Sequence, residues 1–357
     1  MESSLIQNPP PSHGRGAVLP RVVRAVEWWE FKLSPIFATV YATALLLGLP
    51  LASLWPLLLL ALGALVPGAA YVSVINDLTD MDEDLASGKS NRLVGRSRAF
   101  VAGVLACCVL PGLAVAFYWR GDALLLSLYL AAWVAFTLYS VRPFRLKKRG
   151  VLGLLADASG AHLFPTLVVV VLVFRWRAVA PDAAWFAAVA VWSLSLGLRG
   201  NLWHQLGDRE NDEKVRLRTF ARRHKITLLQ RVGNLVIFPS EALAFAAMLW
   251  LLGSVAVVVS LALYLLLEWS RRMMWRTDVV VVVPKERASI VMLEYYEVFF
   301  PVALLLSSAT SHRWDALVLV AHLLLFPRRA TRVLKDTLKL AKQAAFMFLV
   351  AARRGGS

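Results

Sequence analysis

Four side chains with oxygen donors follow an apolar run that is long enough to cross a bilayer. Asn76, Asp77, Asp80 and Asp84 come directly after residues 55–75. At about 100° per residue, these four positions fall within one arc of roughly 100° on a helix. Because carboxylates at the end of a spanning helix are costly, the cluster is a candidate functional site. Oxygen donors on one face suit a hard cation such as Mg²⁺, and we expect that ion to hold a phosphate group.

A second pair of carboxylates lies just beyond another apolar run, residues 183–203. Asp208 and Asp212 are four residues apart and share a helix face. Two facing carboxylate clusters are what two Mg²⁺ ions bridging a diphosphate require, so we interpret both clusters as metal ligands. The alternative for the second cluster is a generally charged, solvated segment.

Basic side chains follow the first cluster and the fourth apolar run. Lys89 and Arg92 come after the first cluster, and Arg145 and Lys147 come after Tyr139 at the end of the fourth run. Cations at these positions complement phosphate oxygens and the charge that builds on a departing diphosphate. The positive-inside rule alone also supplies cations here, so both interpretations stay open, with phosphate binding preferred for Lys147 and Arg92. Tyr139 serves equally as a diphosphate ligand or as an aromatic at the membrane interface.

Polar side chains also fall inside the apolar runs, where Asp and His rarely face lipid. Asp157 and His162 lie within residues 151–174, and Asn201 and His204 lie one and two turns back from the second cluster. These four either line a pocket for a second substrate or make hydrogen bonds between helices. We take them as candidates for an acceptor pocket.

The composition is that of a membrane protein. Hydrophobic residues make up 59% of the 357 residues and charged residues only 17%, and the mean hydropathy is +0.62. The net charge of +16 would suit nucleic acid. We exclude nucleic acid as a partner because the basic residues lie in the short segments between apolar runs.

Nine apolar runs have about the 17–25 residues that a spanning helix needs. They are residues 35–54, 56–76, 99–118, 122–140, 151–174, 183–203, 232–251, 254–270 and 289–308. Each loop after an even-numbered run holds at least four Lys or Arg, and each loop after an odd-numbered run holds at most two. By the positive-inside rule, the N-terminus and both acidic clusters face the cytoplasm.

The two ends of the chain differ from the apolar region. We expect residues 1–24 to be disordered, residues 25–310 to form one transmembrane domain, and residues 311–357 to hold a short apolar run and a basic tail. The short run, 315–327, either crosses the membrane or re-enters it. The Ala-, Val-, Leu- and Arg-rich composition favours a bacterial source, and therefore the inner (cytoplasmic) membrane.

With these motifs in their membrane setting, the chain resembles the UbiA superfamily of intramembrane prenyltransferases over roughly residues 25–310. The NDxxDxxxD motif of that family is met by the first cluster, and the DxxxD-type motif by Asp208 and Asp212. One departure is Pro143, which stands where many members have the Lys of YxxxK. The local string resembles the YSxxPxxLKxxG form of the chlorophyll-synthase-like branch, which makes Lys147 the better phosphate ligand.

The resemblance implies an all-α, polytopic fold, with nine helices around a central cavity that opens sideways to lipid. It also implies Mg²⁺-dependent ionisation of an isoprenyl diphosphate. We therefore expect transfer of the isoprenyl group to a small hydrophobic, conceivably aromatic, acceptor.

Three alternatives stay open. A terpene cyclase would work on one substrate alone, and a phosphoribosyl transferase would use a polyprenyl phosphate as acceptor and would need a more polar pocket. A non-catalytic lipid-binding or transport protein is disfavoured, because both motifs are intact and no internal repeat is visible. The sequence does not indicate the oligomeric state.

Overall fold

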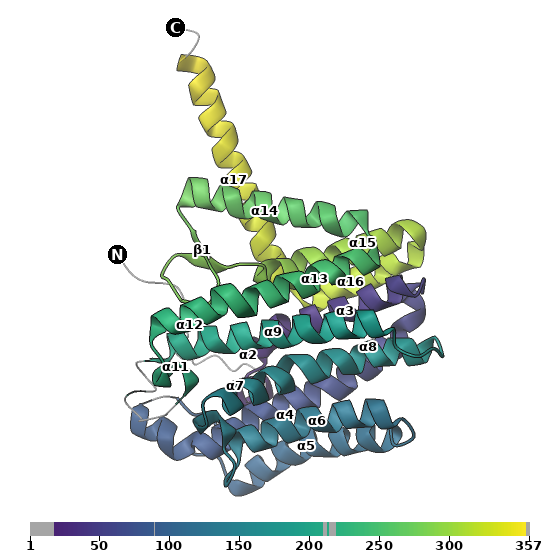
Figure 1. Cartoon of the computed structure of the whole chain (residues 1–357), viewed down its shortest axis with the longest axis vertical. Helices are drawn as coiled ribbons and strands as arrows, with labels where there is room; N and C mark the ends of the chain where they lie inside the picture. Colours follow the sequence, from purple (N-terminus) through teal and green to yellow (C-terminus); the bar gives the residue numbers. More distant parts are fainter. Residues whose placement is uncertain (1–17, 89, 210–212, 214–218, 355–357) are drawn as a thin grey trace.

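The computed structural model describes residues 18–88, 90–209, 213 and 219–354. Long helices lie side by side in one bundle (Figure 1). Six helical segments are long and apolar enough to cross a membrane: Leu51–Ala86, Arg98–Tyr118, Ala123–Ser140, Val151–Trp176, Ala183–Gly207 and Ile226–Leu252. The predicted all-α, polytopic membrane fold is therefore confirmed.

The helices follow one another in a simple order. They are α1 (Val18–Val22), α2 (Ala25–Trp28), α3 (Ser34–Leu46), α4 (Trp55–Ser87), α5 (Arg98–Tyr118), α6 (Ala123–Ser140), α7 (Val151–Ala158), α8 (Phe164–Trp176), α9 (Ala183–Gly207), α11 (Phe220–Arg223), α12 (Ile226–Val232), α13 (Phe238–Leu252), α14 (Val255–Trp275), α15 (Phe300–Ser311), α16 (Ala316–Leu325) and α17 (Pro327–Arg354). Strands β1 (Asp278–Val280) and β2 (Ala288–Ile290) pair in parallel, with Asp278 opposite Ala288.

Four wide π turns are each followed by a proline; three lie inside apolar runs and one directly precedes the first run. The turns are Trp29–Leu33, Ser159–Leu163, Gly233–Ile237 and Tyr295–Phe299, and each leads into a helix with proline in its first turn. Proline has no N–H and its ring clashes with the carbonyl four residues earlier, so the chain widens there. Pro301 frees the carbonyl of Glu297 in this way, and Ser34 Oγ donates to that oxygen at 2.6 Å.

Helix α4 extends well beyond its apolar run and carries the first acidic cluster. It continues to Ser87 and ends where Gly88 adopts a left-handed conformation, with φ of 71°. The helical phase assumed for the cluster is therefore correct, because all four of its members belong to one uninterrupted helix.

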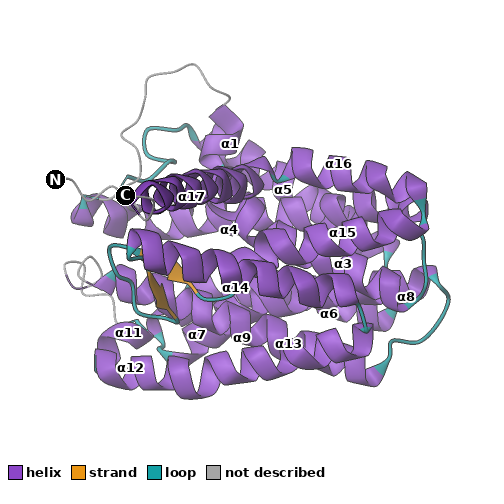
Figure 2. Cartoon of the chain, turned by 90° about the horizontal axis from the view of Figure 1, so that it is seen from above, coloured by secondary structure: helices purple, strands orange, loops and turns teal. Residues whose placement is uncertain are grey.

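The bundle has two unlike ends. Helices α4, α6 and α9 finish at one end, together with α11, the start of α12 and the two strands (Figures 1 and 2). We call this the basic-loop end, because it includes the basic loops 88–97, 141–150 and 276–287. Loops 47–50, 119–122 and 177–182 lie at the opposite end. Among the described residues, the first acidic cluster, Asp208 and the basic loops thus lie at one end of the bundle, as the loop charges predict.

The N-terminal segment begins close to the acidic cluster. Residues 1–17, most of the predicted disordered segment, lie outside the described residues, whereas Val18–Val22 is helical. The Val22 side chain is buried and packs against Val74 of α4 and Leu93. This contact holds the following residues against the end of α4.

The short run 315–327 forms a half-length helix rather than a full crossing. Asp315 accepts hydrogen bonds from the backbone N–H groups of Leu51 and Ala52, at 3.0 and 2.7 Å, which holds the start of α16 at the opposite end. Ten residues of helix extend only about 15 Å, half of the hydrocarbon core. The first turn of the next helix, α17, lies against Glu30. The Glu30 carboxylate accepts hydrogen bonds from the backbone N–H groups of Arg328 and Arg329, at 3.0 and 2.8 Å.

Candidate active site

One face of α4 carries both an apolar stripe and the acidic cluster. A cavity is lined on this helix by Ala64, Leu65, Gly68, Ala69, Val72 and Ser73. Asn76 and Asp77 lie four residues after Val72 and Ser73, so they continue the same stripe. Side chains spaced by three and four residues share a face, and the acidic cluster therefore stands at one mouth of the cavity.

Asp77 is the most deeply buried member of the cluster. Its carboxylate is hydrogen-bonded and ion-paired to Arg24, which lies just before α2 in a left-handed conformation with φ of 52°. Its second oxygen, Oδ2, is buried and has no hydrogen-bond partner among the residues that the structure describes. Asn91 donates to the Asp77 backbone carbonyl at 2.7 Å and to the Asp84 carboxylate at 2.9 Å, which links two members of the cluster.

Asp80 is held by two cations from the loop after α6. Arg145 donates to Asp80 at 2.9 Å, and Lys147 is also paired with that carboxylate. Arg145 and Lys147 are both buried, although they belong to a loop. Burial lowers the pKa of Lys147, and the Asp80 carboxylate acts in the opposite direction. Arg145 and Lys148 also pair with Glu83, at 2.9 and 2.6 Å, so this loop is fixed to the helix by several ion pairs.

The remaining first-cluster and basic residues occupy the same region. Asn76 accepts a hydrogen bond from Ser140 at the end of α6. Arg92 pairs with Glu27 of α2 at 2.5 Å, and its charge also acts on Asp77. Tyr139 is half-buried on the last turn of α6. Lys89 lies outside the described residues, so its predicted role stays a prediction.

The donor set can be compared with the needs of Mg²⁺. Among the described residues, no group of three or more His, Cys, Asp or Glu side chains converges as a metal site. Cations instead pair with two of these carboxylates, Arg24 with Asp77 and Lys147 with Asp80. The buried, unpartnered Oδ2 of Asp77 nevertheless has the character of a metal ligand. Four oxygen-bearing side chains on one helix face add the hard donors that Mg²⁺ prefers. These residues would therefore fit a magnesium ion, which would take the places that Arg24 and Lys147 occupy at the carboxylates.

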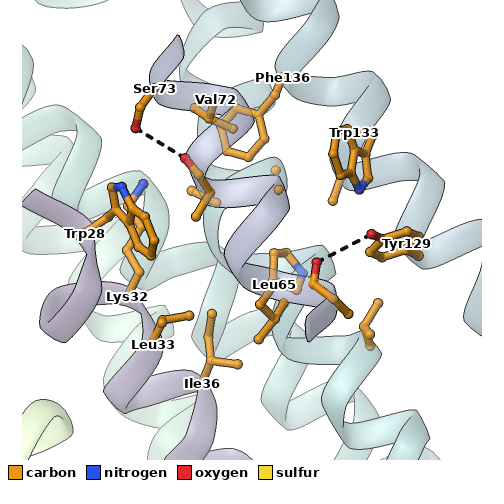
Figure 3. A pocket seen from close by; sticks show the side chains of 18 residues that line it. Trp28, Lys32, Leu33, Ile36, Leu65, Val72, Ser73, Tyr129, Trp133 and Phe136 are labelled. Atoms are coloured by element: carbon orange, nitrogen blue, oxygen red, sulfur yellow. Dashed lines mark hydrogen bonds between the residues drawn. The ribbon is translucent and has the colours of Figure 1, made fainter. Parts of the chain in front are cut away.

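The cavity next to the cluster is apolar and rich in aromatic rings. Its empty space, including the open mouth, is about 740 Å³. Trp28 and Lys32 approach it from the N-terminal segment, and Tyr129, Trp133 and Phe136 approach it from α6 (Figure 3). From Ala64 to Ser73 the lining of α4 extends roughly 14 Å, at 1.5 Å per residue. Lys32 is the single charged side chain in this described lining.

The second cluster is only partly visible. Asp208 is exposed at the C-terminal end of α9, and Asp212 lies outside the described residues. How the two clusters face each other therefore stays a prediction. Both α4 and α9 finish at the basic-loop end (Figure 1).

The candidate acceptor residues form hydrogen bonds between helices. Asn201 donates to the Asp157 carboxylate at 2.7 Å and accepts from Gln205 at 2.7 Å. His162 lies on the π turn after α7, and the ring of His204 packs against Trp203. None of the four candidates is among the residues that line the described cavity.

Several residues of the site were not singled out from the sequence. Arg24 is the cation that pairs with Asp77, and Lys32 lines the cavity. Asn91 links two members of the acidic cluster. Arg24 and Lys32 precede the first apolar run, where they read as ordinary interfacial cations. Glu83 reads as a solvated loop residue. A clue to Glu83 is its spacing, since Asp80 and Glu83 stand three residues apart on the helix and meet the same arginine.

One family model matches most of the chain. A family model described as the UbiA prenyltransferase family matches residues 36–280, more than half of the chain. A solved structure of a UbiA homolog from Archaeoglobus fulgidus bound to GPP and Mg²⁺ is 15% identical, with 91% of this chain and 100% of that chain covered and a TM-score of 0.47. A second structure, of a UbiA homolog from the same organism with DMAPP and Mg²⁺, is 16% identical, with 91% and 99% covered and a TM-score of 0.44. No curated protein matches the chain.

Proposed function

The chain belongs to the UbiA prenyltransferase family, and on that premise we propose that it transfers an isoprenyl group from an isoprenyl diphosphate to a hydrophobic acceptor within the membrane. One observation carries the proposal. A single face of α4 leads from an apolar, aromatic cavity to an acidic cluster surrounded by cations. This arrangement suits a donor substrate that has an apolar isoprenyl chain and a charged diphosphate group.

The diphosphate is bound by cations that now pair with carboxylates. Arg145, Lys147 and Arg92 each approach the acidic cluster or its immediate surroundings. Asn76, Asp77, Asp80 and Asp84 would hold Mg²⁺, with Asp208 and Asp212 completing a second site, and the ion would neutralise diphosphate charge. Arg145, Lys147 and Arg92 would donate to phosphate oxygens. Charge-assisted hydrogen bonds of this kind stabilise a departing diphosphate.

The isoprenyl chain occupies the apolar cavity. The allylic C–O bond breaks, its electron pair leaves with the diphosphate, and an allylic carbocation remains. The rings of Trp28, Tyr129 and Trp133 present π faces that stabilise such a cation. The apolar walls exclude the water that would otherwise capture it. The acceptor then supplies the electron pair for the new bond, and Asp157, His162, Asn201 and His204 stay the candidates for its pocket.

The test is Mg²⁺-dependent diphosphate release by the purified full-length protein, with a panel of isoprenyl diphosphates. Asp80→Asn removes a proposed metal ligand, whereas Asp82→Asn removes an exposed carboxylate from the opposite face of the same helix. We expect Asp80→Asn to lose release and Asp82→Asn to keep it. Equal activity of the two variants would contradict the assignment of the acidic face.

The acceptor dependence of release separates the remaining alternatives. Release that requires an added hydrophobic acceptor supports the transferase. Release with a cyclised product and no acceptor would identify a terpene cyclase instead. Absence of release with every isoprenyl donor, from folded protein, would overturn the proposal and favour a sugar-diphosphate donor or a binding role.

A further inference from the structure

Helix α17 leaves the bundle in a different direction from the other long helices. In Figure 1 it runs across the direction of the other long helices, passes α14 and projects beyond the bundle, and in Figure 2 it is strongly foreshortened while the other helices lie in the plane. If the bundle helices cross a membrane, α17 therefore lies nearly parallel to the membrane plane. A helix in that position is surrounded by protein on one side and by the membrane interface on the others.

Polar contacts fix one face of α17 to the bundle. Asp336 accepts from Arg271 of α14 at 2.7 Å, and Gln343 accepts from Trp275 Nε1 at 2.7 Å. Leu340, which lies between them along the helix, is buried. Because Arg271 and Trp275 belong to the last turns of α14, these contacts place α17 at the basic-loop end.

A second face of α17 is apolar and unpartnered by protein. The face comprises Leu334, Leu338, Ala341 and Ala345, which follow the four-, three- and four-residue spacing of one helix stripe. Leu334 and Leu338 are 59% and 53% exposed. The neighbouring helix α14 also exposes large apolar side chains, namely Leu263, Leu265, Leu266, Trp269 and Met273. The apolar surface of the bundle thus continues onto α17.

A third face of α17 is cationic. Lys335, Lys339 and Lys342 repeat at four and three residues, about 100° around the helix from the leucine stripe. Asp336 is the single acidic residue of this helix, and its carboxylate is already paired with Arg271. All three lysines are exposed, and the Lys339 ammonium lies over the Trp275 ring of α14, 5.1 Å from its centroid. No acidic side chain of their own helix neutralises the stripe.

From these three faces we propose that α17 is an interfacial helix that binds an anionic phospholipid surface. The leucine stripe lies at the boundary between acyl chains and headgroups, and the lysine stripe extends to the headgroup phosphates. A leaflet with anionic lipids attracts juxtamembrane lysines, whereas a zwitterionic one does not. The role is independent of the proposed reaction, because none of these side chains belongs to the acidic face of α4 or to its cavity.

Nitroxide accessibility in nanodiscs tests the proposal on the full-length protein. Cys107 and Cys108 are first replaced by alanine, and labels are then placed at Leu338→Cys and, separately, Lys339→Cys. In nanodiscs of phosphatidylcholine with phosphatidylglycerol, we expect collisions with oxygen to dominate at position 338 and collisions with a water-soluble nickel complex to dominate at position 339, with the ratio of the two rates differing at least about twofold. Equal, water-like accessibility at both positions would overturn the proposal.

The charge requirement has a matched control. The triple variant Lys335→Glu, Lys339→Glu, Lys342→Glu reverses the lysine stripe, and Arg120→Glu, Arg177→Glu, Arg313→Glu reverses three cations at the opposite end. With the label at Leu338→Cys, the first variant should lose its lipid accessibility and the second should keep it. Wild-type-like lipid contact in the first variant, or in nanodiscs of phosphatidylcholine alone, would refute the anionic-surface assignment.

Discussion

At the scale of single residues, the site is defined by which carboxylates are neutralised and by what. Asp77 lies in a nearly closed environment, where Arg24 is its cationic partner and one of its oxygens has no partner. Asp80 has two cations from one loop. A buried carboxylate that loses its cation is strongly destabilising. We therefore propose that these carboxylates contribute to protein stability in the absence of substrate and bind the ligand in its presence.

This dual role gives a prediction for Arg24→Gln. The change leaves Asp77 buried without its cation, so we expect the full-length protein to lose about 1–3 kcal/mol of stability. Mg²⁺ should then raise the melting temperature of the variant more than that of the wild type, because the ion takes over the position of the guanidinium. The measurement is thermal unfolding in detergent with and without Mg²⁺.

Arg92→Gln is the control for this prediction, because Arg92 pairs with the partly exposed Glu27 rather than with a buried acid. Its stability should change by less than about 1 kcal/mol, as for other exposed pairs. If Mg²⁺ stabilises both variants and the wild type equally, Asp77 does not bind the ion.

The residue scale also marks where sequence reasoning stops. The four members of the first cluster follow from helical periodicity, because their spacing is local. Arg24 lies 53 positions from Asp77 and reaches it through a left-handed residue and a short helix, which no local pattern indicates. The ion pair of Glu241 is likewise not indicated by any local sequence pattern. Its carboxylate accepts two hydrogen bonds from Arg199 of α9, at 2.6 and 2.7 Å.

At the scale of elements, the apolar runs predicted that helices are present more accurately than they predicted where those helices begin and end. The run 56–76 became a 33-residue helix, because the acidic cluster continues it. The run 289–308 lost its first residues to β2 and a π turn. The π turns precede prolines, but the sequence alone does not show which prolines widen the turn before them, because this depends on packing with other helices. One example is the Glu297 carbonyl, which accepts a hydrogen bond from Ser34 of another helix.

A close contact between α7 and the loop 141–150 restricts the position of that loop, which carries Arg145 and Lys147. Gly153 on α7 lies so near the backbone of the 141–150 loop that an added Cβ would stand 2.5 Å from the carbonyl oxygen of Leu146 and 2.9 Å from Cα of Lys147. Backbone atoms cannot rotate away as a flexible side chain can. The position of Lys147 therefore depends on the absence of a side chain at residue 153.

Gly153→Ala should displace this loop and weaken donor binding. Overpacking of this kind typically costs about 1–3 kcal/mol, and we expect a higher KM for the isoprenyl diphosphate together with a lower melting temperature. Gly200→Ala is the matched control, because nothing lies within 4 Å of its added Cβ. In a helix interior this control should be neutral or stabilising. An unchanged KM in Gly153→Ala would show that the loop tolerates the shift.

At the scale of the whole molecule, the cavity joins elements that are far apart in the sequence. Its walls come from the N-terminal segment, α4, α6 and the π turn before α8 (Figure 3). The sequence predicted a central cavity only through the family resemblance, because its depth depends on how these helices pack. If the isoprenyl chain occupies this cavity as proposed, we expect the size of the side chains on α4 to limit how far it can extend from the acidic cluster.

Gly68 offers a direct way to change that length. It lies on the cavity-lining stripe, about two turns from the acidic cluster, and an added Cβ would be 3.9 Å from the ring of Trp133, which is ordinary contact. Gly68→Ala should therefore keep the selectivity of the wild type, whereas Gly68→Phe fills the middle of the cavity. With dimethylallyl, geranyl, farnesyl and geranylgeranyl diphosphates as donors, kcat/KM of Gly68→Phe should fall most for the longest chains and least for dimethylallyl diphosphate. A loss of about 1–3 kcal/mol in transition-state binding, or roughly 10–200-fold, is the scale expected when a hydrophobic pocket no longer fits its substrate. A uniform loss across all four donors would place the isoprenyl chain outside this cavity, even if the acidic face of α4 still binds the diphosphate.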